Sequence, residues 1–279
     1  MSGDLLYRIP FLDYCEFEGV NISSLKAMRR SPAHFLEAAA SNKRPSPAMR
    51  KGSATHCAVF EPARFVEDYL RHTEPRLDKR TKAFKELVEA NPFKEILGQS
   101  EYDAVIALRD AVRAHPVAVE LLAEGRPEVS MIWTDDETGI DCKGREDWIT
   151  PSGTLVGLKT AARADPWAFA RQSAQLGYHL QWAYYADGYE AIMGHAPTSV
   201  IEIVVETERP YDVVPYRIGA DTIAQGREEY RALLRRLRDC VEADHWPGTT
   251  VDMIDFELPA WAINDVETVL TIGGQEVSL

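Results

Sequence analysis

Residues 144–160, GREDWITPSGTLVGLKT, decide the fold of this chain. Two runs with strand composition, 140–150 and 154–160, flank a turn of Thr-Pro-Ser-Gly-Thr. Proline, serine and glycine are residues that tight turns select. The stretch therefore predicts an antiparallel hairpin centred on Ser152.

One face of this hairpin carries residues that suit a metal ion. Pairing about Ser152 puts Asp147 opposite Gly157, with Cβ positions roughly 5 Å apart. Lys159 lies two residues beyond Gly157 and so points to the same face. A carboxylate at position 157 would complete a pair for a hard divalent cation. A structural ion pair of Asp147 with Arg145 or Lys159 is the alternative interpretation.

The preceding strand-like run, 128–134, brings a further acid near this face. Glu128 lies there if the first hairpin turns about Glu137, although a slip of one residue would move it to the other side. Phosphodiester hydrolysis needs neutralised phosphate charge and a water of lowered pKa, which carboxylate-bound Mg²⁺ supplies. A neighbouring lysine can orient that water or stabilise developing charge.

Composition places the chain among ordinary globular proteins. It has 279 residues, 45% hydrophobic and 27% charged, enough for one large domain or two small ones. No apolar run approaches the roughly 18–20 residues of a membrane span, and the first residues lack a signal-peptide charge pattern. We expect a cytoplasmic protein with no membrane partner. Its four cysteines form no C-x-x-C pair, which argues against a zinc ribbon and favours reduced thiols.

Charge is unevenly distributed along the chain. The net charge of −13 argues mildly against nucleic acid as a partner. However, residues 26–51 hold seven Lys or Arg and one acid, and residues 71–94 form a second basic cluster. Residues 239–279 hold nine acids and no Lys or Arg. The basic part either meets phosphates or is simply a set of solvated faces.

The order of elements indicates an α/β fold with a central mixed sheet flanked by helices, behind a helical N-terminal lobe. We expect a single domain with a lobe at 1–125, a core at 126–245 and an acidic tail at 246–279. Besides the strands above, strands are predicted at 198–206 and 211–218. Helices are predicted from Ser23 or Ser24, from Ser31-Pro, around 54–60, and at 80–90, 99–124, 165–193 and 220–242.

These motifs together resemble the PD-(D/E)xK nuclease superfamily. Asp147 and the Gly157-Leu-Lys159 run resemble its signature, spread over two strands. Gln181-Trp-Ala-Tyr-Tyr185 resembles the QxxxY motif of the RecB-like and lambda-exonuclease-like branch. The following segments resemble RecE-like enzymes (exonuclease VIII): Ile22-Ser-Ser-Leu-Lys, Ser31-Pro-Ala-His-Phe, Gly52-Ser-Ala-Thr-His56, Arg80-Thr-Lys-Ala-Phe-Lys85 and Trp246-Pro-Gly248.

The resemblance implies a restriction-endonuclease-like core and a Mg²⁺-dependent exonuclease on double-stranded DNA ends, with Mn²⁺ as a possible substitute. Such an enzyme resects 5′ strands and leaves 3′ overhangs for recombination. It also implies a ring-shaped homo-oligomer and a single-strand annealing partner from the same phage or prophage operon.

The resemblance also assigns roles to residues. The metal ligands would be His56, Asp147, the carbonyl of Leu158 and possibly Glu128. Lys159 would position water, and Gln181 and Tyr185, which lie one turn apart on a helix, would hold the substrate end. Basic residues expected to contact DNA are Arg80, Lys82 and Lys85.

Gly157 departs from this pattern, because the family has Asp or Glu there. The chain is then either an engineered inactive form or a natural pseudo-nuclease, and the intact remaining site favours the first. In both cases we expect impaired activity and predict that Gly157→Asp restores it. The alternative function is a catalytically silent DNA-end-binding or scaffold protein. An iron–sulphur nuclease of the same superfamily is disfavoured, since Cys240 is the only cysteine beyond the core.

Overall fold

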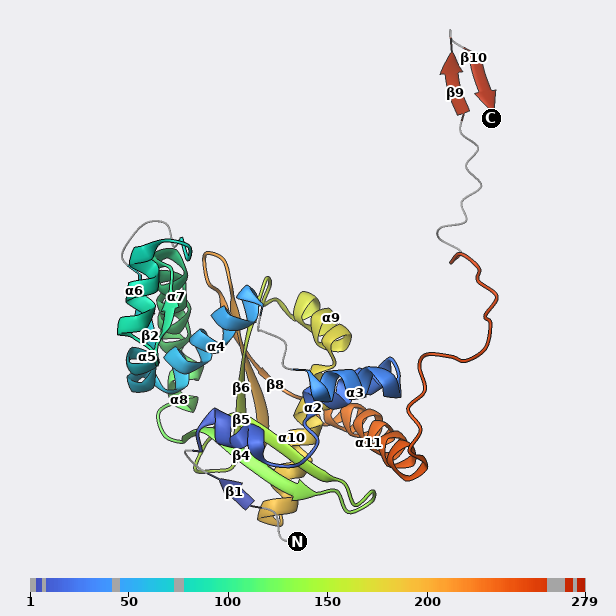
Figure 1. Ribbon diagram of the computed structural model, residues 1–279, viewed down its shortest axis with the longest axis horizontal. Helices are drawn as coiled ribbons and strands as arrows, with labels where there is room; N and C mark the ends of the chain where they lie inside the picture. The colour runs from blue at the N-terminus through green and yellow to red at the C-terminus, as the bar shows by residue number, and fades with distance from the viewer. Residues whose placement is uncertain are drawn as a thin grey trace.

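A six-stranded mixed sheet in the order β1-β4-β5-β6-β7-β8 forms the centre of the computed structural model (Figure 1). The structure describes residues 4–6, 9–41, 46–72, 78–259, 269–272 and 275–278. The strands of this sheet are β1 (Asp4–Leu6), β4 (Arg126–Thr134), β5 (Asp141–Ile149), β6 (Thr154–Ala161), β7 (Ser199–Glu206) and β8 (Val213–Arg217). The five predicted strands are confirmed, and β1 adds an unpredicted edge strand.

The sheet is antiparallel except where β6 and β7 run parallel. A parallel pair needs a long crossover, which α9 (Pro166–Leu176) and α10 (Tyr178–Met193) provide. The parallel strands β6 and β7 carry apolar residues on both faces, because helices cover both sides of the sheet. In β6, Leu155 packs into one core and Leu158 into the other.

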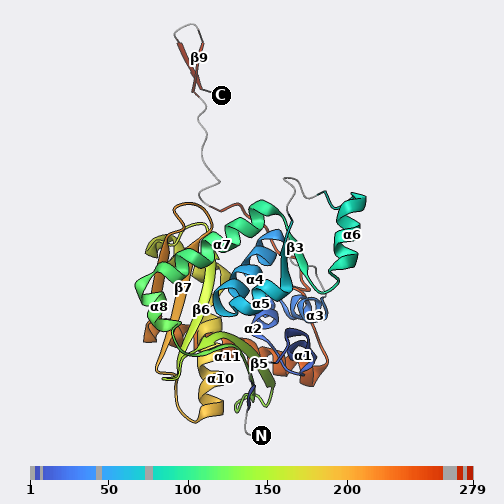
Figure 2. The same ribbon diagram turned by 90° about the vertical axis from the view of Figure 1, so that its left-hand side faces the viewer.

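Two helical layers therefore enclose the sheet (Figures 1 and 2). One layer packs on the face of Val156 and Leu158; its helices are α4 (Pro47–Phe60), α7 (Gln99–Ala114) and α8 (Pro116–Leu121). The other packs on the face of Leu155 and Val204; it comprises α2 (Ile22–Leu25), the 3₁₀ helix η1 (Lys26–Arg29), α3 (Pro32–Ala40), α9, α10 and α11 (Ala220–Ala243). The predicted mixed sheet flanked by helices is confirmed. The helices of 1–125, expected to form an N-terminal lobe, supply part of both layers.

The remaining elements are short. They are α1 (Phe11–Glu16), α5 (Pro62–Asp68), α6 (Lys82–Ala90), the parallel pair β2 (Tyr69–Arg71) and β3 (Glu95–Leu97), and the hairpin β9 (Val269–Ile272) and β10 (Gln275–Ser278). Residues 247–259 contain neither helix nor strand and are mostly exposed. In the described part of the chain, no helix has the length and apolarity to cross a membrane.

Three predicted helix boundaries are wrong. The single helix expected over 165–193 is two helices, because Gly177 adopts φ 65° and ends α9 in a left-handed conformation. The helix expected over 99–124 breaks at Pro116, which has no N–H to continue α7. Asn21, rather than Ser23 or Ser24, caps α2 by accepting from the backbone N–H of Ser24 at 2.9 Å. Ser31 caps α3 as predicted.

Candidate functional site

Asp147 lies where β5 and β6 separate. The two strands pair at Trp148–Val156 and Ile149–Leu155, which is the predicted register. One residue further along, the backbone N–H of Leu158 donates to Asp147 Oδ2 at 2.8 Å. The carboxylate is therefore fixed by the strand that carries Gly157 and Lys159. Burial alone would raise the pKa of Asp147, but His56 and Lys159 outweigh it and bring the pKa to about 2.

His56 reaches this carboxylate from α4, a helix that lies far earlier in the chain. Its Nδ1 lies 3.3 Å from Asp147 Oδ2. Gly52, one turn before His56, faces β6, and a Cβ there would make an ordinary van der Waals contact of 3.9 Å with the Thr160 hydroxyl oxygen. Burial lowers the pKa of His56, but attraction to Asp147 raises it above its usual value. The structure thus brings together the two residues that the resemblance pairs.

Glu128 approaches the same place from β4. The register pairs Pro127 with Trp148 and Val129 with Glu146, so Glu128 is level with Asp147. Its backbone φ of 50° is unusual for a residue other than glycine and marks a local distortion of the strand. Its Oε2 accepts from Arg145 Nε at 2.7 Å. Burial and repulsion by Asp147 raise the pKa of Glu128.

Lys159 and Lys26 place two cations beside one another. Lys159 Nζ lies 3.6 Å from Glu202 Oε1, 3.5 Å from the carbonyl oxygen of Leu158 and 5.5 Å from the centre of the Tyr178 ring. Lys26, from η1, lies 5.6 Å from that ring. Burial, with repulsion from Lys159, lowers the pKa of Lys26 to about 8. Lys26 belongs to the Ile22-Ser-Ser-Leu-Lys segment, but no role is predicted for it from the sequence.

Glu202 belongs to the site, although it is not predicted from the sequence. It lies on β7, which pairs in parallel with β6 so that Glu202 is level with Gly157. A Cβ at position 157 would lie 2.6 Å from Glu202 Oε1 and 2.9 Å from Oε2. The absence of an acid at position 157 therefore leaves no empty space, because a carboxylate from the neighbouring strand fills it. The only signal in the sequence was one acid inside the apolar run Val200-Ile-Glu-Ile-Val-Val205.

Of the two QxxxY residues, the structure brings Tyr185 to the site. Its ring packs over Gly144, where a Cβ would lie 2.8 Å from Cε1, and burial raises its pKa. Gln181 is half-buried on the same helix but is not among the residues that line the cleft described below. Its neighbour Trp182 instead donates Nε1–H to Glu202 Oε2 at 2.6 Å.

A cleft of 1430 Å³ opens over this constellation. Its wall includes His56, Glu128, Arg145, Asp147, Lys159 and Tyr185. The elements that supply these residues are α4, β4, β5, β6 and α10. Glu202 lies beneath this wall, 1% exposed. The three residues expected to contact DNA are not among those that line the cleft: Lys82 and Lys85 lie on α6, and Arg80 lies just before it. Figure 2 shows α6 at the edge of the molecule.

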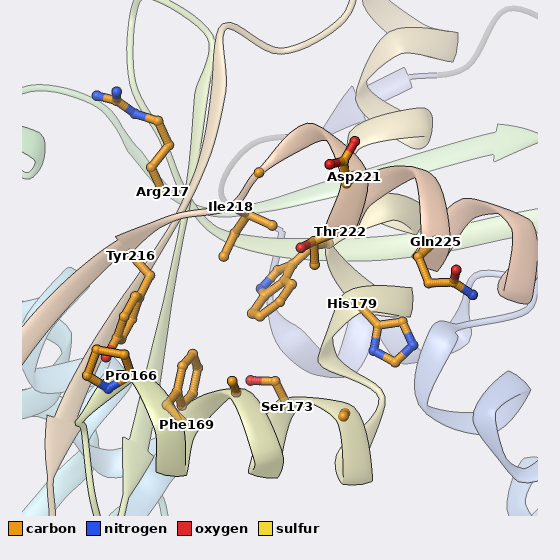
Figure 3. A pocket seen from close by; sticks show the side chains of 14 residues that line it. Pro166, Phe169, Ser173, His179, Tyr216, Arg217, Ile218, Asp221, Thr222 and Gln225 are labelled. Carbon is orange, nitrogen blue, oxygen red and sulfur yellow. The ribbon is translucent and has the colours of Figure 1, made fainter.

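A second, smaller cavity of 530 Å³ lies between α9, β8 and the start of α11 (Figure 3). Phe169, Tyr216 and Ile218 make its lining largely apolar, and Asp221 is its one carboxylate. The only other metal-donor side chain in the lining is His179, whose Nε2 is paired with Glu229 Oε2 at 2.9 Å. Trp182 lines it and is also the residue that holds Glu202.

The donor set of the larger cleft suits a divalent cation. Carboxylates, a carbonyl and an imidazole are ligands for Mg²⁺ and Mn²⁺. Among the described residues, no group of three or more His, Cys, Asp or Glu side chains is placed to hold a metal ion. However, Glu202 Oε1 is buried without a hydrogen-bond partner, and such an atom is costly unless something binds it. The residues present therefore fit a metal that would bind between Asp147 and Glu202.

Comparison with known proteins agrees with this geometry. Residues 21–255 match the family described as PDDEXK-like domain of unknown function (DUF3799). The chain belongs to this family. Its membership places the protein in the PD-(D/E)xK nuclease superfamily and supports a nuclease function.

Two solved structures can be compared with the PDDEXK-like chain. The first is the crystal structure of a "Putative exonuclease" from Eubacterium rectale, with 12% sequence identity and a TM-score of 0.60. The matched region spans 89% of this chain and 94% of the chain in that structure. It shows the same restriction-endonuclease-like fold. The crystal structure of SSO0001 is 15% identical with a TM-score of 0.29, covering 66% of this chain and 88% of its own. No curated protein matches the chain.

Proposed function

We propose that this PDDEXK-like protein is a Mg²⁺-dependent exonuclease that acts on the ends of double-stranded DNA. One observation carries the proposal: His56, Asp147 and Lys159, from separate elements, meet in one cleft beside a buried carboxylate. The resemblance to RecE-like enzymes supports the finer features. They are digestion of 5′ strands, 3′ overhangs for recombination, a homo-oligomeric ring and a single-strand annealing partner.

The residues of the site have complementary tasks in this proposal. Asp147, Glu202, His56 and the Leu158 carbonyl would hold the cation, which when bound neutralises phosphate charge and lowers the pKa of a water. Lys159 remains protonated: burial lowers its pKa, but Glu202 and Asp147 raise it further. Its ammonium group can donate to the attacking water or to the developing charge on the phosphate. Arg145, held by Glu128, is a further basic side chain of the cleft wall.

The main alternative is a catalytically silent DNA-end-binding or scaffold protein. That alternative predicts DNA binding without turnover even when a carboxylate is restored at position 157. Since the Glu202 carboxylate already occupies the space beside Gly157, the geometry favours a nuclease over the silent protein. The scaffold predicts DNA binding without turnover in the assay described next.

The test is digestion of linear duplex DNA that carries a label at the 5′ or 3′ end of one strand. We expect nucleotide release from the linear duplex with Mg²⁺, none with a chelator, and none from a closed circular duplex. Asp147→Asn and Lys159→Ala should reduce the rate by about a thousandfold, as loss of a principal electrostatic group does. Absence of cleavage by the wild type with Mg²⁺ and with Mn²⁺ would refute the proposal. Equal cleavage of the closed circle would replace it with an endonuclease.

A further inference from the structure

Glu202 and Gly157 are neighbours only because β6 and β7 run parallel. Their backbones are paired directly, Gly157 with Glu202, and paired residues of adjacent strands point to the same face of a sheet. The oxygens of an aspartate lie two covalent bonds beyond its Cβ. A Cβ at position 157 would be 2.6 and 2.9 Å from the two Glu202 oxygens, so those oxygens occupy the region that the carboxylate of an aspartate at this position would use.

The surroundings of Glu202 are unusual for a purely structural acid. Its side chain is 1% exposed. Oε2 accepts from Trp182 Nε1 at 2.6 Å, which fixes the carboxylate group. Oε1 has no hydrogen-bond partner, and the nearest cation, Lys159 Nζ, is 3.6 Å away. One oxygen is held in place by a hydrogen bond, and the other forms only an ion pair with Lys159 and accepts no hydrogen bond, which leaves it a lone pair for a metal ion.

We propose that Glu202 is a metal ligand of this site and replaces, from the adjacent strand, the carboxylate that the superfamily carries at position 157. This inference rests on the proposed function and adds a residue to it. Gly157 is then a requirement of the site, because any side chain there would displace the Glu202 carboxylate. The site keeps two carboxylates, Asp147 and Glu202, on the two sides of β6.

The first experiment measures Mn²⁺ binding by isothermal titration calorimetry, which needs no turnover. Glu202→Gln keeps the shape of the side chain and an acceptor for Trp182 but removes the charge. We expect its Mn²⁺ affinity to fall by at least about tenfold, since even residues that only support ligands commonly cost that much. The matched control is Glu206→Gln, on the same strand and face, where the carboxylate accepts from the backbone N–H of Ala164 at 2.9 Å. Its Mn²⁺ affinity should equal that of the wild type.

The second experiment exchanges the carboxylate between strands. Glu202→Ala should bind Mn²⁺ weakly, and Gly157→Asp added to it should recover affinity, because the space and the charge are then both restored at position 157. Circular dichroism and a thermal melt would verify that each variant is folded before titration. The Glu202→Gln comparison still decides the question if Glu202→Ala does not fold.

The outcomes separate the inference from the proposed function. If the wild type binds Mn²⁺ and digests DNA while Glu202→Gln binds Mn²⁺ equally well, the role of Glu202 is refuted and the nuclease stands. If the wild type neither binds Mn²⁺ nor digests DNA, the proposed function is refuted and the inference with it. If Glu202→Gln loses affinity and Glu206→Gln does not, Glu202 is a ligand.

Discussion

Replacing Gly157 with alanine tests the packing around Glu202 with one methyl group. In the interior of a strand, Gly→Ala normally stabilises a protein by about 0.5–1 kcal/mol, because glycine loses more backbone entropy on folding. Here the new Cβ would lie 2.6 Å from Glu202 Oε1, well inside a normal contact. The carboxylate has little freedom to retreat, because it is buried and bonded to Trp182. Overpacking of this kind costs about 1–3 kcal/mol.

The two contributions leave a net loss in the free energy of unfolding of about 1 kcal/mol, and of about 2.5 kcal/mol at most. For a chain of this size, a loss of about 1 kcal/mol lowers the melting temperature by roughly 2–4 °C. Thermal unfolding followed by circular dichroism measures it. The control is Gly52→Ala in α4, where the nearest atom to a new Cβ is 3.9 Å away and a gain of about 0.5–1 kcal/mol is expected.

A rise in melting temperature for both variants would refute the reasoning, because it would show that the Glu202 carboxylate does not fill the space beside Gly157.

Gly157→Asp alone should not activate the enzyme, since it places the aspartate carboxylate against the carboxylate of Glu202. This replaces the expectation, drawn from the sequence, that Gly157→Asp restores activity.

Three further predictions concern the cleft and its surroundings. Lys159→Ala should retain duplex binding, measured by fluorescence anisotropy, while its single-turnover rate falls by about a thousandfold; loss of binding instead would give Lys159 a role in affinity. Trp182→Phe leaves Glu202 Oε2 without its donor, so the free energy of unfolding in urea should fall by about 1–3 kcal/mol, together with Mn²⁺ affinity; unchanged values would show that the indole N–H does not position the carboxylate. Combined alanine substitution of Arg80, Lys82 and Lys85, on and just before α6, should flatten the salt dependence of DNA binding. The slope should fall by roughly 0.9 per lost phosphate contact; an unchanged slope would place the DNA surface elsewhere.

Sequence reasoning succeeded where structure depends on neighbours in the chain. The turn at Thr150–Thr154 determines the register of the hairpin, and the Asp147–Gly157 alignment follows from it. The cap at Ser31 and the five strands likewise depend on residues close in sequence. The position of His56 is different, because only the resemblance to a family placed that helix beside Asp147.

Errors arose where one local signal competed with another. Asn21 caps α2 in preference to the two serines that follow it, and Gly177 ends α9 although apolar spacing continues through it. Both residues are recognised break or cap signals, so a stricter use of turn chemistry would have found them.

The sequence by itself determined the nuclease-like hairpin and showed a glycine where an acid was expected. The tertiary structure alone decided what that glycine means. Gly157 and Glu202 are separated by a crossover of two helices, and the register of a parallel pair is set by how those helices pack rather than by any turn. A contact between residues so far apart in the chain leaves no local pattern, so an apparent gap in the sequence corresponds to a filled position in the folded protein.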